Sequence, residues 1–158
     1  MWCPGQTPPN LHHERRFTMN WFSTTFSIQT EKQGLHNFTR QVQEQIDGWQ
    51  VRTGMAFLFV PHTSASLVVN ESYDPTARRD LESYLSHVAP EGQDWHVHTI
   101  EGADDSSAHM RTMITPISLT VPIDYGKLSL GAWQGIYLAE HRRRGHLRQV
   151  HLRVLAVA

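Results

Sequence analysis

Two segments of the chain alternate between apolar and polar positions, which is the period of a β-strand that buries one face. The first begins at Trp21, and its inward positions are Phe22, Thr24, Phe26 and Ile28. The second spans 149–156, and its inward positions are Val150, Leu152, Val154 and Ala156. Apolar runs predict further strands at 55–60, 66–70 and 116–122, and the segment 128–140 predicts a strand or hairpin.

Three other segments carry helical signals. Apolar residues recur at spacings of three and four over 35–49, which predicts an amphipathic helix. A second helix is predicted to start at Asp74-Pro75, because aspartate caps helix N-termini and proline suits the first turn. The predicted core face of that helix is Ala77, Leu81, Tyr84, Leu85 and Val88. The acidic and serine residues at 104–107 predict the cap of a short third helix ending near Met113.

The spacing of these elements predicts the fold class. The late strands lie too close together in sequence for helical crossovers, so they are expected to pair antiparallel. We therefore predict an α+β fold, a mostly antiparallel β-sheet with about three short helices packed on one face. Residues 1–18 contain three prolines and no periodicity, which indicates an extended or disordered N-terminal extension to a single domain over 19–158.

Composition narrows the function classes. The 158 residues carry a net charge of −1, so no global basic field recruits nucleic acid. The single cysteine, Cys3, excludes an intramolecular disulfide and a zinc site built from several cysteines. No apolar run approaches the ~20 residues that span a bilayer, and no secretory signal is visible. These features predict a cytoplasmic protein with no nucleic-acid or membrane partner.

Eleven histidines make metal binding or proton transfer a candidate chemistry. His62 follows a buried-looking strand at a proline break and opens the segment His62-Thr63-Ser64-Ala65-Ser66. Hydroxyls and free backbone N–H groups there could hold an anion, with His62 as metal ligand or proton carrier. The residues alone favour the alternative, a tight turn. Asn70-Glu71, at the far end of the next strand, forms a further polar pair.

Asp105 and His109 lie one turn apart at the start of the predicted third helix. A carboxylate at this spacing can orient an imidazole, or both groups can bind one metal. The alternative is an N-terminal cap beside an exposed histidine. His96 and His98 lie in the preceding loop and are assigned to the surface.

A third cluster extends from Gly131 to Arg148. Trp133 and Gln134 lie between two glycines, and Trp133 could equally be a core residue. A basic turn is predicted at Arg142, Arg143 and Arg144, and it would suit a phosphorylated ligand. The alternative is a solvated turn, which a run of charged residues forms more often. The chain has no P-loop, no GxGxxG helix start and no GxSxG elbow, so no nucleotide cofactor is expected.

Taken together, the clusters resemble the YjbQ family of secondary thiamine-phosphate synthases. The matching segments include GLHNFT at 34–39, HTSASL at 62–67, Asn70-Glu71, Asp74-Pro75, Asp104-Asp105 with Ala108-His109, and LSLGAWQ at 128–134. The resemblance covers about 19–157. Ala132 departs from the family pattern, which usually has threonine there.

The resemblance implies a homotrimer whose polar cleft lies near a subunit boundary, and a small phosphorylated metabolite as ligand. It also implies a reaction that joins a pyrimidine methyl diphosphate to a thiazole phosphate and releases pyrophosphate, with help from a divalent ion such as Mg or Zn. The candidate catalytic residues are His62, Asp105, His109 and Glu71. The candidate substrate-binding residues are Thr63, Ser64, Ser66, Asn70, Trp133, Gln134 and Arg142. The candidate metal ligands are His62 and His109. The alternatives are a metal-dependent hydrolase of a phosphorylated or acyl metabolite, and a non-catalytic module that binds a metal or anion.

Overall fold

The computed structural model describes residues 18–157, so the predictions for the N-terminal extension fall almost wholly outside the described residues. The strands are β1 (Met19–Gln29), β2 (Lys32–Asn37), β3 (Gly54–Phe59), β4 (Ala65–Glu71), β5 (Ser118–Asp124), β6 (Lys127–Leu128), β7 (Gln134–Arg144) and β8 (Leu147–Val157). The helices are α1 (Thr39–Gly48), α2 (Pro75–Val88) and α3 (Asp105–Ile114).

The strands form two antiparallel sheets, which confirms the predicted α+β class. One sheet has the order β1-β8-β3-β5-β6 and the other the order β2-β7-β4. β7 turns into β8 at Gly145, where the chain passes close to the connection between β1 and β2. A Cβ atom added to Gly145 would lie 2.0 Å from the carbonyl oxygen of Thr30, so only glycine fits this junction.

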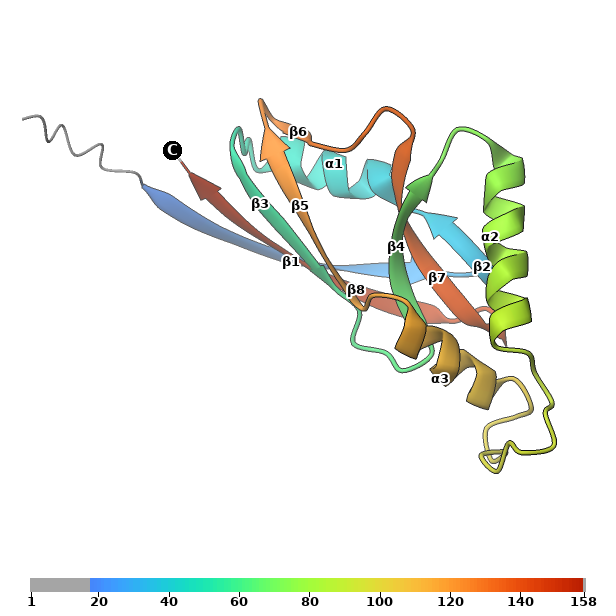
Figure 1. The fold of residues 1–158 in the computed structure, drawn as a ribbon. Helices are drawn as coiled ribbons and strands as arrows, with labels where there is room; N and C mark the ends of the chain where they lie inside the picture. Colours follow the sequence, from blue (N-terminus) through green and yellow to red (C-terminus); the bar gives the residue numbers. More distant parts are fainter. Residues whose placement is uncertain (1–17, 158) are drawn as a thin grey trace, which may run out of the picture.

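The main core lies between the two sheets (Figure 1). Leu58 and Leu152 of the five-stranded sheet belong to the same buried cluster as Leu67 and Leu138 of the three-stranded sheet. The helix α1 adds its own buried face, Val42 and Ile46, to this cluster. The alternating apolar positions of β1 and β8 thus face inward as predicted.

Contrary to the prediction from the sequence, the three helices do not all pack on one face of one sheet. The helix α2 lies against the outer side of the three-stranded sheet (Figure 1), where Leu81 packs on Leu35 and Tyr137. The side chain of Asp74 caps this helix by accepting a hydrogen bond from the backbone N–H of Thr76, as the sequence predicted. Only part of the predicted core face is covered, because Tyr84 and Val88 are exposed.

Two local predictions were wrong because pairing between distant strands overrides the local sequence pattern. Leu35 lies in strand β2 and not in the first helix, which starts at Thr39, because 34–37 pairs with β7. The arginines 142–144 extend β7 and do not form a turn, and the chain reverses at Gly145. No helix within the described residues is both long and apolar enough to cross a membrane.

Candidate functional site

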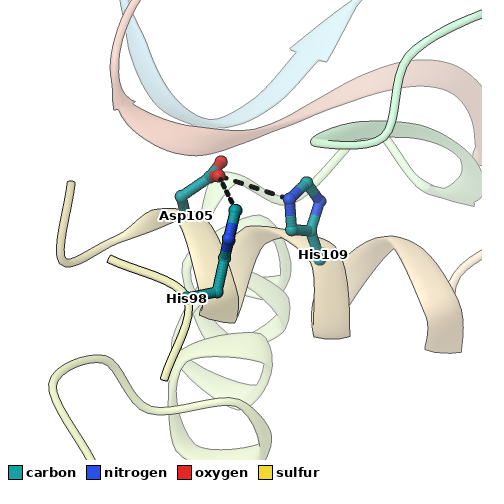
Figure 2. Close-up of side chains that lie close together, drawn as sticks. All are labelled: His98, Asp105 and His109. Carbon is teal, nitrogen blue, oxygen red and sulfur yellow. Dashed lines mark hydrogen bonds and ion pairs between the residues drawn. The ribbon is translucent and has the colours of Figure 1, made fainter. Parts of the chain in front are cut away.

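A buried carboxylate, that of Asp105, lies at the centre of the site (Figure 2). Its Oδ1 atom accepts a 2.6 Å hydrogen bond from Nη1 of Arg142. Its Oδ2 atom lies 2.8 Å from Nε2 of His98 and 3.3 Å from Nε2 of His109. One carboxylate oxygen is therefore fixed by an arginine while the other faces two imidazole rings.

The three side chains come from α3 and from the loop before it. Asp105 and His109 are one helical turn apart, as predicted, so both project from the same face of α3. His98 reaches them because the loop folds back on the helix. The hydroxyl of Ser106 donates a 3.0 Å hydrogen bond to the carbonyl of His98, which holds this loop against the first turn.

The hydrogen bonds of His109 determine which of its nitrogens is free. Nδ1 lies 2.9 Å from the carbonyl oxygen of Thr63, which can only accept, so Nδ1 carries the proton. In the neutral ring Nε2 then presents a lone pair, and that lone pair faces Oδ2 of Asp105. Two acceptors in this geometry repel each other unless a proton or a metal ion lies between them.

The arrangement fits a divalent metal ion. The candidate ligand atoms of His98, Asp105 and His109 all lie within 4.8 Å of one another. Histidine ligands usually donate their second N–H to a carbonyl or carboxylate, and ligating carboxylates are themselves hydrogen-bonded. Thr63 and Arg142 provide these two partners. Both imidazoles are partly exposed, so additional coordination positions face solvent.

Arg142 is engaged by acidic groups. Besides Asp105, it contacts both carboxylate oxygens of Asp104 and the carbonyl of Glu101. Burial alone would raise the pKa of Asp104, but hydrogen bonds from Arg142 and from the backbone N–H of Arg143 outweigh burial and lower the pKa to about 2. The hydrogen bond with Asp104 likewise raises the pKa of Arg142. Its guanidinium therefore orients Asp105, and a role of Arg142 in substrate binding stays a prediction.

An open cavity of about 850 Å³ adjoins the cluster. His62, Thr63 and His109 line its polar part. Met113, Pro116 and Ile117 line an apolar part. Its volume is sufficient for a small molecule, and its wide opening leaves one side of such a ligand in solvent.

The remaining hydroxyls of the HTSAS segment lie inside the protein. Oγ of the buried Ser66 lies 2.8 Å from Nε2 of His141 and 2.7 Å from the hydroxyl of Thr115. Ser64 accepts a 3.1 Å hydrogen bond from Arg148, which forms a buried ion pair with Glu140. Neither serine lines the cavity. Ser66 connects β4 to β7 through His141, and Ser64 connects the loop that carries His62 to β8 through Arg148.

The other predicted site residues gather at the opposite end of β4. Glu71 pairs with Gln134 in the sheet, whereas Ala65, near the histidines, pairs with Glu140. Six residues of strand separate these ends by roughly 20 Å. At the far end, the side-chain Oδ1 of Asn70 accepts a hydrogen bond from the backbone N–H of Glu71. Trp133 is exposed there.

Within one chain, the structure thus brings His62, Asp105 and His109 to one region and places Asn70, Glu71, Trp133 and Gln134 elsewhere. Sequence reasoning missed the contribution of His98. The available signal was a histidine seven residues before Asp105, close enough for a loop to return it to the helix start.

Comparisons with known proteins agree with this fold. A family model described as UPF0047 protein YjbQ-like matches residues 24–157. UPF0047 protein sll1880 of Synechocystis sp. is 42% identical over 127 residues, which cover 80% of this chain and 86% of that protein. UPF0047 protein YjbQ of Salmonella typhimurium is 37% identical over 131 residues, covering 82% and 94%.

Solved structures give the same result. The conserved hypothetical protein TT1486 of Thermus thermophilus superposes with a TM-score of 0.73 at 35% identity, covering 82% of this chain and 97% of that one. A YjbQ/UPF0047 protein of Clostridium acetobutylicum superposes with a TM-score of 0.74 at 34% identity, covering 83% and 98%. The match in sequence over nearly all described residues, together with the shared fold, shows that the chain belongs to the YjbQ-like UPF0047 family.

Proposed function

We propose that the protein is a divalent-metal-dependent enzyme that acts on small phosphorylated metabolites. The reaction we propose is of the thiamine-phosphate synthase type, which joins a pyrimidine methyl diphosphate to a thiazole phosphate and releases pyrophosphate. The main support is the cluster of His98, Asp105 and His109, in which a lone pair of His109 faces a carboxylate oxygen. The resemblance of the sequence motifs to secondary thiamine-phosphate synthases supports the choice of reaction.

The chemistry of this reaction requires charge neutralisation at the diphosphate. A divalent ion held by the cluster would supply positive charge to the leaving group. Among residues 18–157, no arginine lines the cavity, and Arg142 is paired with Asp104 and Asp105, so the described side chains of the cavity wall supply little positive charge of their own. The apolar wall formed by Met113, Pro116 and Ile117 offers contact area for an aromatic ring of the substrate.

We further propose that the enzyme is a homotrimer, as the family resemblance implies. The polar group Asn70, Glu71, Trp133 and Gln134 lies at the opposite end of β4 from His109. It can join the metal cluster in one cleft only if a neighbouring subunit supplies it. This arrangement would also cover Trp133, whose side chain is exposed in the single chain.

Hydrolysis of a small phosphorylated or acyl metabolite is the second candidate function. The observation that favours it is the ligand set itself, because three protein side chains with a solvent-facing side are typical of catalytic zinc, which activates water.

The test is to measure metal content and pyrophosphate release on the same preparations. Purified protein should bind one divalent ion per chain, and the His98→Ala, Asp105→Asn and His109→Ala variants should lose it. With the pyrimidine and thiazole substrates, the metal-loaded protein should release pyrophosphate, and each variant should lose at least 100-fold in rate, as expected when a ligand or an oriented acid–base group is removed. His87→Ala is the matched control, since His87 is an exposed histidine on α2.

Each outcome has a distinct meaning. Metal binding with release of phosphate or an acid from single substrates, but no coupling of the two rings, would favour the hydrolase. Metal binding without turnover would favour a non-catalytic binding module. Wild-type protein that binds no divalent ion would contradict the proposed metal site.

A further inference from the structure

We propose that His62 is an N–H donor that binds an anionic phosphoryl oxygen in the cavity, and is neither a ligand of the metal nor a general base. This inference rests on the proposed function for the identity of the ligand. The chemistry of His62 itself depends only on the geometry around its ring.

The hydrogen bonding of His62 begins with the end of strand β3. β3 ends at Phe59, which pairs with His151 of β8. Continuing this register would place Pro61 opposite Gln149, but the chain leaves the sheet there. The backbone N–H of Gln149 donates instead to Nε2 of His62, at 2.9 Å. The imidazole thus takes the place that a strand carbonyl would have occupied.

This hydrogen bond determines the tautomer of His62. A backbone N–H can only donate, so Nε2 must offer its lone pair, and the proton of the neutral ring then lies on Nδ1. A neutral imidazole has one such lone pair. Since Gln149 occupies it, His62 has none left to coordinate a metal or to accept a proton from a substrate.

The surroundings of His62 favour the neutral ring. Partial burial of the imidazole lowers the pKa of His62, and the positive charge of Arg148 lowers it further, against an opposing effect of Glu140. His62 therefore remains a neutral N–H donor at physiological pH. Nδ1 has no hydrogen-bond partner among residues 18–157.

The position of His62 places this donor beside the metal cluster. His62 and His109 both line the open cavity. The residue after His62, Thr63, provides the carbonyl that orients His109. The same short loop thus carries His62 and fixes the tautomer of His109. His109 has its lone pair toward the carboxylate of Asp105, and His62 has its lone pair toward β8, which leaves its N–H for the ligand.

The first measurement is direct and needs no activity. Long-range proton–nitrogen correlation spectra of nitrogen-15-labelled wild-type protein report the tautomer of each histidine, and the His62 signals are assigned by their absence in His62→Ala. We expect the Nδ1–H tautomer, with and without one equivalent of zinc, and a shift of the Nδ1 resonance when inorganic pyrophosphate is added to the zinc-loaded protein. An Nε2–H tautomer would overturn the inference.

The second measurement uses two amide variants that differ in reach. The side chain of His62→Asn carries its N–H close to the position of Nδ1, whereas that of His62→Gln reaches only toward Gln149. Pyrophosphate affinity of the zinc-loaded protein should fall roughly tenfold in His62→Ala and His62→Gln, as expected for loss of a hydrogen bond to a charged group, and should recover in part in His62→Asn. His87→Asn on α2 is the control, and its affinity should equal that of wild type.

The alternative roles predict different results. If His62 were a metal ligand, zinc affinity would fall in His62→Ala, whereas we expect it to be unchanged. If His62 only joined β3 to β8, pyrophosphate affinity would be the same in all three variants as in wild type, and the inference would be overturned. Absence of ring coupling in the activity assay would remove the proposed function but would leave the tautomer and pyrophosphate results to decide the role of His62.

Discussion

Acidification should destabilise the protein through a single buried histidine. His141 lies in β7, is 1% exposed, and has its Nε2 atom 2.8 Å from the hydroxyl of Ser66 in β4. Burial lowers the pKa of His141 to about 4, from an ordinary 6.5, and the nearby charges of Arg111 and Arg148 act in the same direction, against an opposing effect of Glu140. The difference is about 2.5 pKa units, and each unit corresponds to about 1.36 kcal/mol, so the linked free energy is roughly 3 kcal/mol.

The sign follows from which state takes up the proton. Above pH 6.5 the ring is neutral in both states, and the full stability is present. Between pH 6.5 and 4 the unfolded chain binds a proton that the folded protein excludes, so the free energy of unfolding falls as the pH falls. Below pH 4 both states are protonated, and His141 causes no further loss. Asp104 affects the free energy of unfolding in a separate pH range. Its pKa is lowered in the folded protein, so its effect on stability is lost only as the pH falls below 3.8, the ordinary pKa of an aspartate.

The assay is urea unfolding at fixed protein concentration from pH 7.5 to 4, for the wild type and for His141→Gln. Glutamine reaches as far as Nε2 and can donate to or accept from Ser66, but it does not titrate. The pKa of His62 is also lowered, but His62 is present in both proteins, so its contribution to the pH dependence of stability cancels in the comparison. The wild type should lose roughly 3 kcal/mol more than the variant across this range.

Two results would refute this prediction. The first is a pair of stability curves that stay parallel within about 0.5 kcal/mol, which is near the error of such measurements. The second is a nuclear magnetic resonance titration in which His141 takes up its proton near its ordinary value of 6.5.

Two further predictions concern the strand junction and the assembly. Gly145→Ala should lower the free energy of unfolding by roughly 1–3 kcal/mol, since its Cβ would overlap the carbonyl of Thr30. In the control Gly48→Ala, the new methyl group meets nothing within 4 Å, and a loss of similar size there would show that the contact is not the cause. Light scattering should give a mass of about three times 18.1 kDa, and mixing the inactive variants His109→Ala and Glu71→Ala should restore part of the activity if one site draws on two subunits. A monomer at micromolar concentration would exclude both the trimer and the shared site.

Local patterns in the sequence determined much of the fold. The alternation in β1 and β8 depends only on the two-residue period of a strand, and the start of α2 depends on aspartate and proline at adjacent positions. The pairing of Asp105 with His109 follows in the same way from the helical period. In each case the residues that interact are at most a few positions apart, so their geometry is set by the backbone conformation itself.

Contacts between distant segments decided the rest. Strand β2 has no period of its own and forms because 34–37 pairs with β7, about 100 residues later. His98 joins Asp105 only because a loop folds back, and the tautomer of His62 is set by the N–H of Gln149, 87 residues away. The sequence could name Glu71 and Gln134 as polar candidates, but only the register of β4 on β7 shows that they lie far from the histidines within one chain. Hydrophobic periodicity specifies which face of an element is buried, whereas loop closure and strand register, which depend on the whole chain, specify which polar groups meet.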